Sequence, residues 1–259
     1  MEEVRLERVG RSSRITLSRP EARNALTRGV VKAIGQAFVA AAADEGSRVV
    51  VLRGAGGHFC AGADLKRTFA EDPDLLDNLE GYLDDYHALV RAIVRCPKPT
   101  VAVLEGAAVG FGADMALACD LRIASDTAYI QEKFVKIGLM PDGGGTFWLP
   151  RLIGTARAMK AMLLADKLEA DALDALGLLV SVHTPDALDA AAEALVGELE
   201  AGPPLAYASI KSAAYASLGD LEGALTRERE GQLRLLRSSD AMEGIAAWAQ
   251  KRAPDFTGK

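Results

Sequence analysis

The sequence predicts an α/β fold whose C-terminal part is helical. In the first half, short apolar runs typical of buried strands alternate with helical patterns, whereas helical patterns prevail from about residue 143 onward. The chain has 259 residues, which is enough to bury a large core. We therefore expect a core over residues 1–196 and a helical region over residues 197–259.

The first quarter of the chain predicts two strands, a helix and a third strand. Val4–Val9 and Arg14–Ser18 are short β-type runs on either side of a turn. Leu26–Ala43 has helical periodicity, and Thr27 suits an N-cap because its hydroxyl can accept a hydrogen bond from the first turn. Val49–Arg53 is almost wholly apolar, as expected for a buried strand.

The middle of the chain continues this alternation. Glu71–Asp74 is acidic and contains a proline, which predicts a surface loop. Helical periodicity covers Leu75–Val94 and ends before two prolines, and a short helix is expected at Gly110–Ala118. Short strands are expected at Thr100–Leu104, Leu121–Ala124 and Ala128–Ile130.

Composition narrows the classes of function. The 36 acidic residues outnumber the 30 basic ones, which argues against nucleic acid as the main partner. We expect no membrane span and no secretory signal, because no apolar run is long enough and an acidic segment opens the chain. The three cysteines lack metal-ligand spacing, so we expect reduced thiols, a cytoplasmic location and no metal site.

Two segments built from small residues are the main functional signal, namely His58–Leu65 and Glu105–Asp120. Each follows an apolar strand and opens a helix. The first N–H groups of a helix have no partner inside it and carry the positive end of its dipole. Two such turns placed side by side can direct two N–H donors at one oxygen, which is the arrangement of an oxyanion hole.

Further motifs extend this signal over nearly the whole chain. They are Leu17–Pro20 (LSRP), Asn24–Leu26 (NAL), Phe134–Thr146 (FVKIGLMPDGGGT) and Glu243–Arg252 (EGIAAWAQKR). In this order and in a chain of this length, the motifs resemble the crotonase superfamily, also called the enoyl-CoA hydratase/isomerase family. Within it, the PDGGGT segment is most similar to the phenylacetate-type ring-epoxide isomerases.

The resemblance implies a ClpP-like spiral of ββα units with a helical C-terminal trimerisation region, assembled as a homotrimer or a dimer of trimers. It implies an acyl-CoA substrate, with coenzyme A entering as part of the thioester and no permanently bound cofactor. The two oxyanion N–H groups would belong to Ala63 and Phe111. Contacts with coenzyme A would come from Arg23, Ala25, Ala61, Asp64, Leu65, Trp248 and Lys251.

Two aspartates are the candidate proton-transfer groups. Asp114 follows Gly110 by one helical turn and has apolar neighbours, so we expect it to face the pocket with a raised pKa. The usual second carboxylate of the hydratases aligns with Phe134, which cannot transfer a proton. Asp142 matches the catalytic Asp of several isomerase branches, although it could instead cap the following helix. Glu132 is a weaker candidate.

The loss of a carboxylate at Phe134 favours double-bond isomerisation, because a single well-placed Asp142 can move a proton along the acyl chain. We expect Phe134 and Trp148 to line the acyl pocket. Hydration of a 2-enoyl-CoA by Asp114 and Asp142 is the close alternative. A non-catalytic CoA-binding or RNA-binding relative is a second alternative.

Overall fold

The computed structural model describes residues 3–71 and 78–257 of the chain. The acidic loop predicted at Glu71–Asp74 lies largely outside these ranges. The strands are β1 (Val4–Val9), β2 (Ser12–Leu17), β3 (Val49–Gly54), β4 (Thr100–Leu104), β5 (Ala107–Val109), β6 (Leu121–Ser125), β7 (Tyr129–Gln131), β8 (Leu168–Glu169) and β9 (Val182–His183). The longer helices before the C-terminal part are α1 (Arg28–Ala43), α2 (Leu65–Glu71), α3 (Leu79–Arg95) and α4 (Phe111–Ala118).

Within the described ranges, six strands form one sheet in the order β1-β2-β3-β4-β6-β9. β1 pairs antiparallel with β2, and the other neighbours pair parallel. A smaller sheet has the order β5-β7-β8. The two-residue strands β8 and β9 lie in the part of the chain for which only helices were predicted, because pairing with β7 and β6 rather than local pattern defines them.

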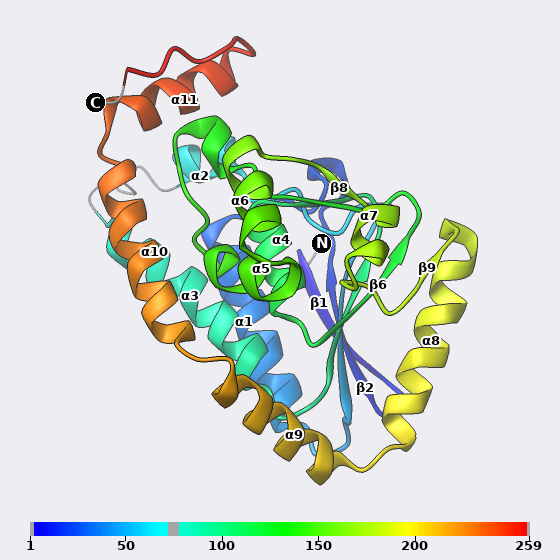
Figure 1. Cartoon of the computed structure of the whole chain (residues 1–259). Helices are drawn as coiled ribbons and strands as arrows, with labels where there is room; N and C mark the ends of the chain where they lie inside the picture. The colour runs from blue at the N-terminus through cyan, green and yellow to red at the C-terminus, as the bar shows by residue number, and fades with distance from the viewer. Residues whose placement is uncertain (1–2, 72–77, 258–259) are drawn as a thin grey trace.

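Both faces of the larger sheet are buried, which explains the apolar runs in its central strands. Val49 and Val51 pack with Leu188 and Val196 of helix α8 (Pro185–Ala201). Val50 and Leu52 belong instead to the main core together with residues of α1 and α3. Figure 1 shows α8 on one side of the sheet and α1 and α3 on the other. Successive strand residues therefore point to opposite helical layers.

The chain after β7 is mainly helical. Its helices besides α8 are η2 (Phe134–Ile137), α5 (Gly145–Ile153), α6 (Thr155–Leu164), α7 (Ala170–Ala175), α9 (Pro204–Ser217), α10 (Leu221–Leu235) and α11 (Ser239–Ala249). α10 packs against α3, and α11 packs against η2, at the end of the molecule where the C-terminus lies (Figure 1). The boundary expected at residue 196 falls within α8, and the division into two functional parts stays a prediction.

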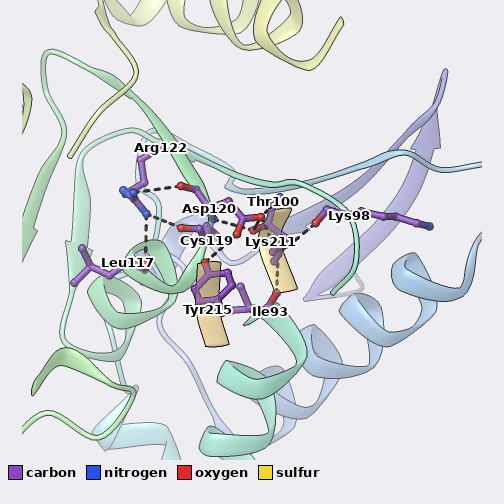
Figure 2. Close-up of polar contacts among 9 residues, drawn as sticks. All are labelled: Ile93, Lys98, Thr100, Leu117, Cys119, Asp120, Arg122, Lys211 and Tyr215. Carbon is purple, nitrogen blue, oxygen red and sulfur yellow. Dashed lines mark hydrogen bonds and ion pairs between the residues drawn. The ribbon is translucent and has the colours of Figure 1, made fainter. Parts of the chain in front are cut away.

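A polar network attaches α9 to the N-terminal ends of strands β4 and β6 (Figure 2). Oδ2 of Asp120 accepts hydrogen bonds from the N–H and the hydroxyl of Thr100, both at 2.8 Å. The same oxygen lies 2.7 Å from Nζ of Lys211, and Oδ1 accepts a hydrogen bond from the Tyr215 hydroxyl at 2.9 Å. Both α9 side chains therefore bind one carboxylate at the junction of β4 and β6.

Predicted element boundaries agree with the structure to within a few residues where the chain is described. Thr27 is the N-cap of α1, and its hydroxyl accepts a hydrogen bond from the N–H of Val30 at 3.4 Å. β2 begins at Ser12 rather than Arg14 because Ser12 pairs with both Val9 and Val49. None of the helices formed by residues 3–71 and 78–257 has the length and apolarity that a membrane-crossing helix needs.

Candidate active site

A cavity of about 660 Å³ lies among α3, the two small-residue turns, η2, α10 and α11. Most of its lining is apolar, but several polar side chains reach it, among them Asp142, Gln232 and a pair of tyrosines. A pocket that is mainly apolar with a few polar groups is typical of a small-molecule site. This cavity is the candidate active site.

The two predicted turns meet at one wall of the cavity. Cys60 forms an isolated bridge with Ala108, and the N–H of Val109 donates a hydrogen bond to the Cys60 carbonyl at 2.9 Å. Nδ1 of His58 accepts a hydrogen bond from the N–H of Ala107 at 3.2 Å. Gly62 has a φ of +85°, and a Cβ there would lie 2.7 Å from the Val109 carbonyl oxygen. The close approach of the turns therefore requires glycine at this position.

Ala63 and Phe111 both line the cavity next to this contact. Leu26 donates to the Gly62 carbonyl and accepts from the N–H of Asp64, so the Ala63 N–H points away from Leu26. Phe111 is the first residue of α4, where an N–H has no partner inside the helix. Neither N–H meets an acceptor in the part of the chain that the structure describes. The turns thus bring two unpaired donors to one cavity wall.

Asp142 lies in the loop between η2 and α5 and lines the cavity. Its Oδ2 accepts a hydrogen bond from Nε2 of Gln232 at 2.9 Å, whereas Oδ1 is buried and has no partner among the described residues. Burial raises the pKa of Asp142 to about 7, with the hydrogen bond from Gln232 acting in the opposite direction. Helix α5 begins at Gly145 with Gly144 as its N-cap, so Asp142 is not the helix cap.

Asp114 does not line the cavity, and the expectation that its side chain faces the pocket is wrong. Its Oδ2 accepts a hydrogen bond from the N–H of Gly143 at 3.0 Å. A Cβ at Gly143 would lie 2.6 Å from the Cβ of Asp114, and one at Gly145 would lie 2.7 Å from its Oδ1. The glycine loop therefore covers Asp114. Burial raises its pKa well above the usual range, as the apolar neighbours predict.

Two glutamates, Glu132 and Glu228, lie near the same glycine loop as Asp114 but do not line the cavity. Glu132 is buried beside Asp114, and neither of its carboxyl oxygens has a hydrogen-bond partner among the described residues. Burial raises the pKa of Glu132 to about 8 and that of Glu228 to about 7. Neither glutamate lines the cavity. Asp142 is therefore the only carboxylate in the cavity lining formed by residues 3–71 and 78–257.

The two expected acyl-pocket side chains lie in different places. Phe134 lines the cavity from η2, close to Gly110 at the start of α4. Trp148 is instead packed against Phe147 and Tyr215, with ring centroids 4.7 and 6.1 Å apart, and lines a separate cavity of about 420 Å³ beside α9. The prediction for Trp148 is wrong because its helix directs this position toward α9.

Of the residues expected to contact coenzyme A, some line the cavity and others do not. Among them, the cavity is lined by Arg23, Ala61, Leu65 and Trp248, but not by Ala25, Asp64 or Lys251. Asp64 forms an ion pair with Arg19 at 2.8 Å and accepts a hydrogen bond from the N–H of Arg67, so it supports the turn.

Sequence reasoning missed further cavity residues, which are Tyr82, Tyr86, Lys133, Lys136, Gln232 and Arg252. The tyrosines lie one turn apart on α3, and their hydroxyl oxygens are 2.5 Å apart. Burial raises the pKa of Tyr82 to about 12, so it is a neutral donor at physiological pH. The helical spacing of the two tyrosines was the available signal. His87, next to them on α3, is also buried.

The chain thus combines an α/β fold with a mainly apolar cavity whose lining includes Ala63, Phe111 and Asp142. The sequence model described as Enoyl-CoA hydratase/isomerase matches residues 12–259. The chain belongs to this family, and the family and fold predicted from the sequence are confirmed.

Named relatives include both hydratases and isomerases. A probable enoyl-CoA hydratase of Rhodobacter capsulatus is 40% identical, with 95% of this chain and 94% of the relative covered. The 1,2-epoxyphenylacetyl-CoA isomerase of Escherichia coli is 36% identical, with 95% and 94% covered. The crystal structure of an enoyl-CoA hydratase from Mycobacterium avium subsp. paratuberculosis has a TM-score of 0.90 at 36% identity, covering 99% of each chain.

Proposed function

We propose that this protein moves the double bond of an enoyl-CoA, converting a 3-enoyl thioester into a 2-enoyl thioester. The observation that carries the proposal is the single carboxylate, Asp142, in the described lining of the cavity. A carboxylate whose pKa is raised to about 7 can act as a base and return the proton as an acid near neutral pH.

In the proposed reaction, the Asp142 carboxylate removes a proton from the α-carbon, between the thioester carbonyl and the C3–C4 double bond. The electron pair of the broken C–H bond delocalises into a dienolate, whose oxygen accepts hydrogen bonds from the N–H groups of Ala63 and Phe111. Asp142 then gives the proton to the γ-carbon, leaving the double bond between C2 and C3. Substrate and product have the same composition. Loss of one such N–H donor typically costs about 10²–10³ in rate.

Hydration needs a group that activates water in addition to one that protonates the α-carbon. By the family resemblance, Phe134 stands where hydratases carry their second carboxylate; Phe134 lines the cavity, and the glycine loop covers Asp114. These two observations favour isomerisation over hydration. Asp114 is accordingly proposed to support the loop rather than to touch substrate.

Coenzyme A is proposed to bind as the carrier part of the substrate, along the basic side of the cavity. Arg23, Lys133 and Lys136 line it and can pair with phosphate groups, whereas Arg252, which also lines it, is paired with Glu243. Trp248 lines the same cavity and is 49% exposed, so its ring is available to stack on an adenine base. No permanently bound cofactor takes part in this reaction.

We further propose that the chain assembles as a homotrimer or a dimer of trimers. Large apolar side chains on α6 and α9 are exposed in the single chain, namely Met159, Leu163, Leu164, Leu205 and Ile210. Exposed apolar residues grouped on helices are typical of protein interfaces. Light scattering coupled to gel filtration tests this proposal, and a monomeric mass at micromolar concentration would contradict it.

A paired assay tests the proposed reaction. The purified protein is incubated with a 2-enoyl-CoA and, separately, with a 3-enoyl-CoA, and the products are separated by mass. The proposal predicts conversion of the 3-enoyl thioester without a change in mass. A product heavier by one water would establish hydration, and absence of both products would favour a non-catalytic role.

A further inference from the structure

Two side chains of helix α10, one turn apart, form hydrogen bonds with the loop that contains Asp142. Glu228 and Gln232 are both buried and both bond to the segment from Met140 to Thr146. They are 82 and 90 residues distant in sequence from the loop groups they bind at Thr146 and Asp142. The helical region thus reaches the group to which we assign proton transfer.

Gln232 makes two contacts that fix the direction of its amide. Its Oε1 accepts a hydrogen bond from the N–H of Met140 at 3.2 Å, and its Nε2 donates to Oδ2 of Asp142 at 2.9 Å. A backbone N–H can only donate, so the amide oxygen must face Met140 and the NH₂ group must face Asp142. Oδ2 is therefore occupied by a donor, and Oδ1 is the oxygen available to carry a proton.

Glu228 binds the other half of the loop. Its Oε2 accepts a hydrogen bond from the N–H of Gly144 at 2.8 Å. Its Oε1 accepts from the N–H of Thr146 at 3.0 Å and from the Thr146 hydroxyl. These contacts satisfy N–H groups at the start of α5, where the helix cap is a glycine without a side chain. The loop on either side of Asp142 is thereby fixed to α10.

We infer that Gln232 and Glu228 are positioning residues for Asp142, with Gln232 directing proton exchange to Oδ1 and Glu228 fixing the backbone of the loop. This inference rests on the proposed role of Asp142 as the proton-transfer group. Neither residue needs to touch the reacting carbons.

Gln232 and Glu228 shift the pKa of Asp142 in opposite directions. The titratable groups that interact with it from the packed elements are Tyr82, Tyr86 and His87 of α3, Asp114 of α4, Glu132 after β7, and Glu228 of α10. The hydrogen bond from Gln232 lowers the pKa of Asp142, whereas the negative charge of Glu228 raises it. The two helix residues therefore act on the pKa of Asp142 in opposite directions.

The Gln232→Met variant removes the donor with little change in volume. A hydrogen bond to a charged group contributes about 1.5 kcal/mol, so we expect the acid limb of the rate profile to move up by about one pH unit. At pH 6 the rate should fall by at least about tenfold, and the plateau kcat should also fall because Asp142 is no longer held in one orientation. Gln36→Met, at an exposed position on α1, is the matched control and should leave the profile unchanged.

The Glu228→Gln variant should move the acid limb to lower pH by less than one pH unit, because Glu228, whose own pKa is raised to about 7, carries only part of its negative charge over that range. It should also lower the plateau kcat, since an amide cannot accept all the hydrogen bonds that the carboxylate accepts. Glu230→Gln makes the same chemical change on an exposed part of α10 and should alter neither quantity. Opposite shifts from two neighbouring residues would not result from a general loss of packing.

Direct titration separates this inference from the proposed function. Carboxyl-¹³C-aspartate labelling, with Asp142 assigned from its missing signal in Asp142→Asn, reports the pKa of Asp142 without turnover. An upward shift in Gln232→Met supports the inference even if Asp142→Asn keeps full activity, which would overturn only the proposed function. Unchanged titration in both α10 variants would overturn the inference. If Gln232→Met fails to fold, Gln232→Glu keeps the side-chain volume and is expected to shift in the same direction.

Discussion

The N–H of Gly143 donates a hydrogen bond to Oδ2 of Asp114 over 3.0 Å. Gly143 directly follows Asp142 in the chain. One loop therefore separates the two aspartates, with Asp142 lining the cavity and Asp114 facing the opposite side of the same backbone. The two carboxyl groups consequently have different environments and, in our account, different roles.

Replacing Gly143 by alanine should disturb this loop. The added Cβ would lie 2.6 Å from the Cβ of Asp114 and 2.7 Å from Cε2 of Phe111, so either the loop or both side chains must move. We expect a loss of about 1–3 kcal/mol in the free energy of unfolding and a lower kcat. Urea unfolding and initial rates measure the two effects.

Gly197→Ala on α8 is the matched control, because a Cβ at Gly197 has no neighbour within 4 Å. Alanine in a helix interior should stabilise the protein by up to about 1 kcal/mol relative to glycine. Equal unfolding midpoints for the Gly143 and Gly197 variants would contradict the close packing described for the loop.

Replacing Lys211 by methionine should weaken the attachment of α9. The change leaves Asp120 partly buried without its cation, although Thr100 and Tyr215 still donate to it. Removing one partner of a buried ion pair typically costs about 3 kcal/mol. The free energy of unfolding should fall by about this amount, whereas Lys160→Met at an exposed ion pair should have no measurable effect. A Lys211 variant as stable as wild type would show that the network does not hold α9.

Stability should decrease as pH rises through neutrality, because Glu132 keeps a proton in the folded protein that the unfolded chain releases. Burial raises the pKa of Glu132 from 4.5 to about 8. Its contribution to stability is therefore complete below about pH 4.5 and is lost as pH rises through 8. Glu132→Gln should flatten this decrease between pH 5 and pH 8.5, as measured by urea unfolding.

Glu198→Gln removes a carboxyl group from an exposed position on α8 and should leave the slope of stability against pH unchanged. Asp142 and Glu228 also have raised pKa values, so the Glu132 variant should retain part of the slope. A slope identical to wild type in Glu132→Gln would mean that Glu132 is ionised in the folded protein.

Local pattern predicted the sheet and the two turns well. The apolar runs of β3 and β4, the Thr27 cap and the small residues around Gly62 each depend on neighbours close in sequence. The orientation of Asp114 was predicted incorrectly because it depends on the loop that covers it, whose Gly143 N–H binds it from 29 residues later in the chain. Gln232 was not predicted at all, since no local pattern connects α10 with Asp142.

The central claim is that Asp142, and not Asp114, transfers the proton. Turnover of a 3-enoyl-CoA by wild type, Asp142→Asn and Asp114→Asn tests it most directly, with thermal unfolding of each variant to confirm folding. Loss of a positioned acid–base group typically costs about 10²–10⁴ in rate, so we predict this loss for Asp142→Asn and less than about tenfold for Asp114→Asn. Full activity of Asp142→Asn, or a greater loss in Asp114→Asn, would contradict the account.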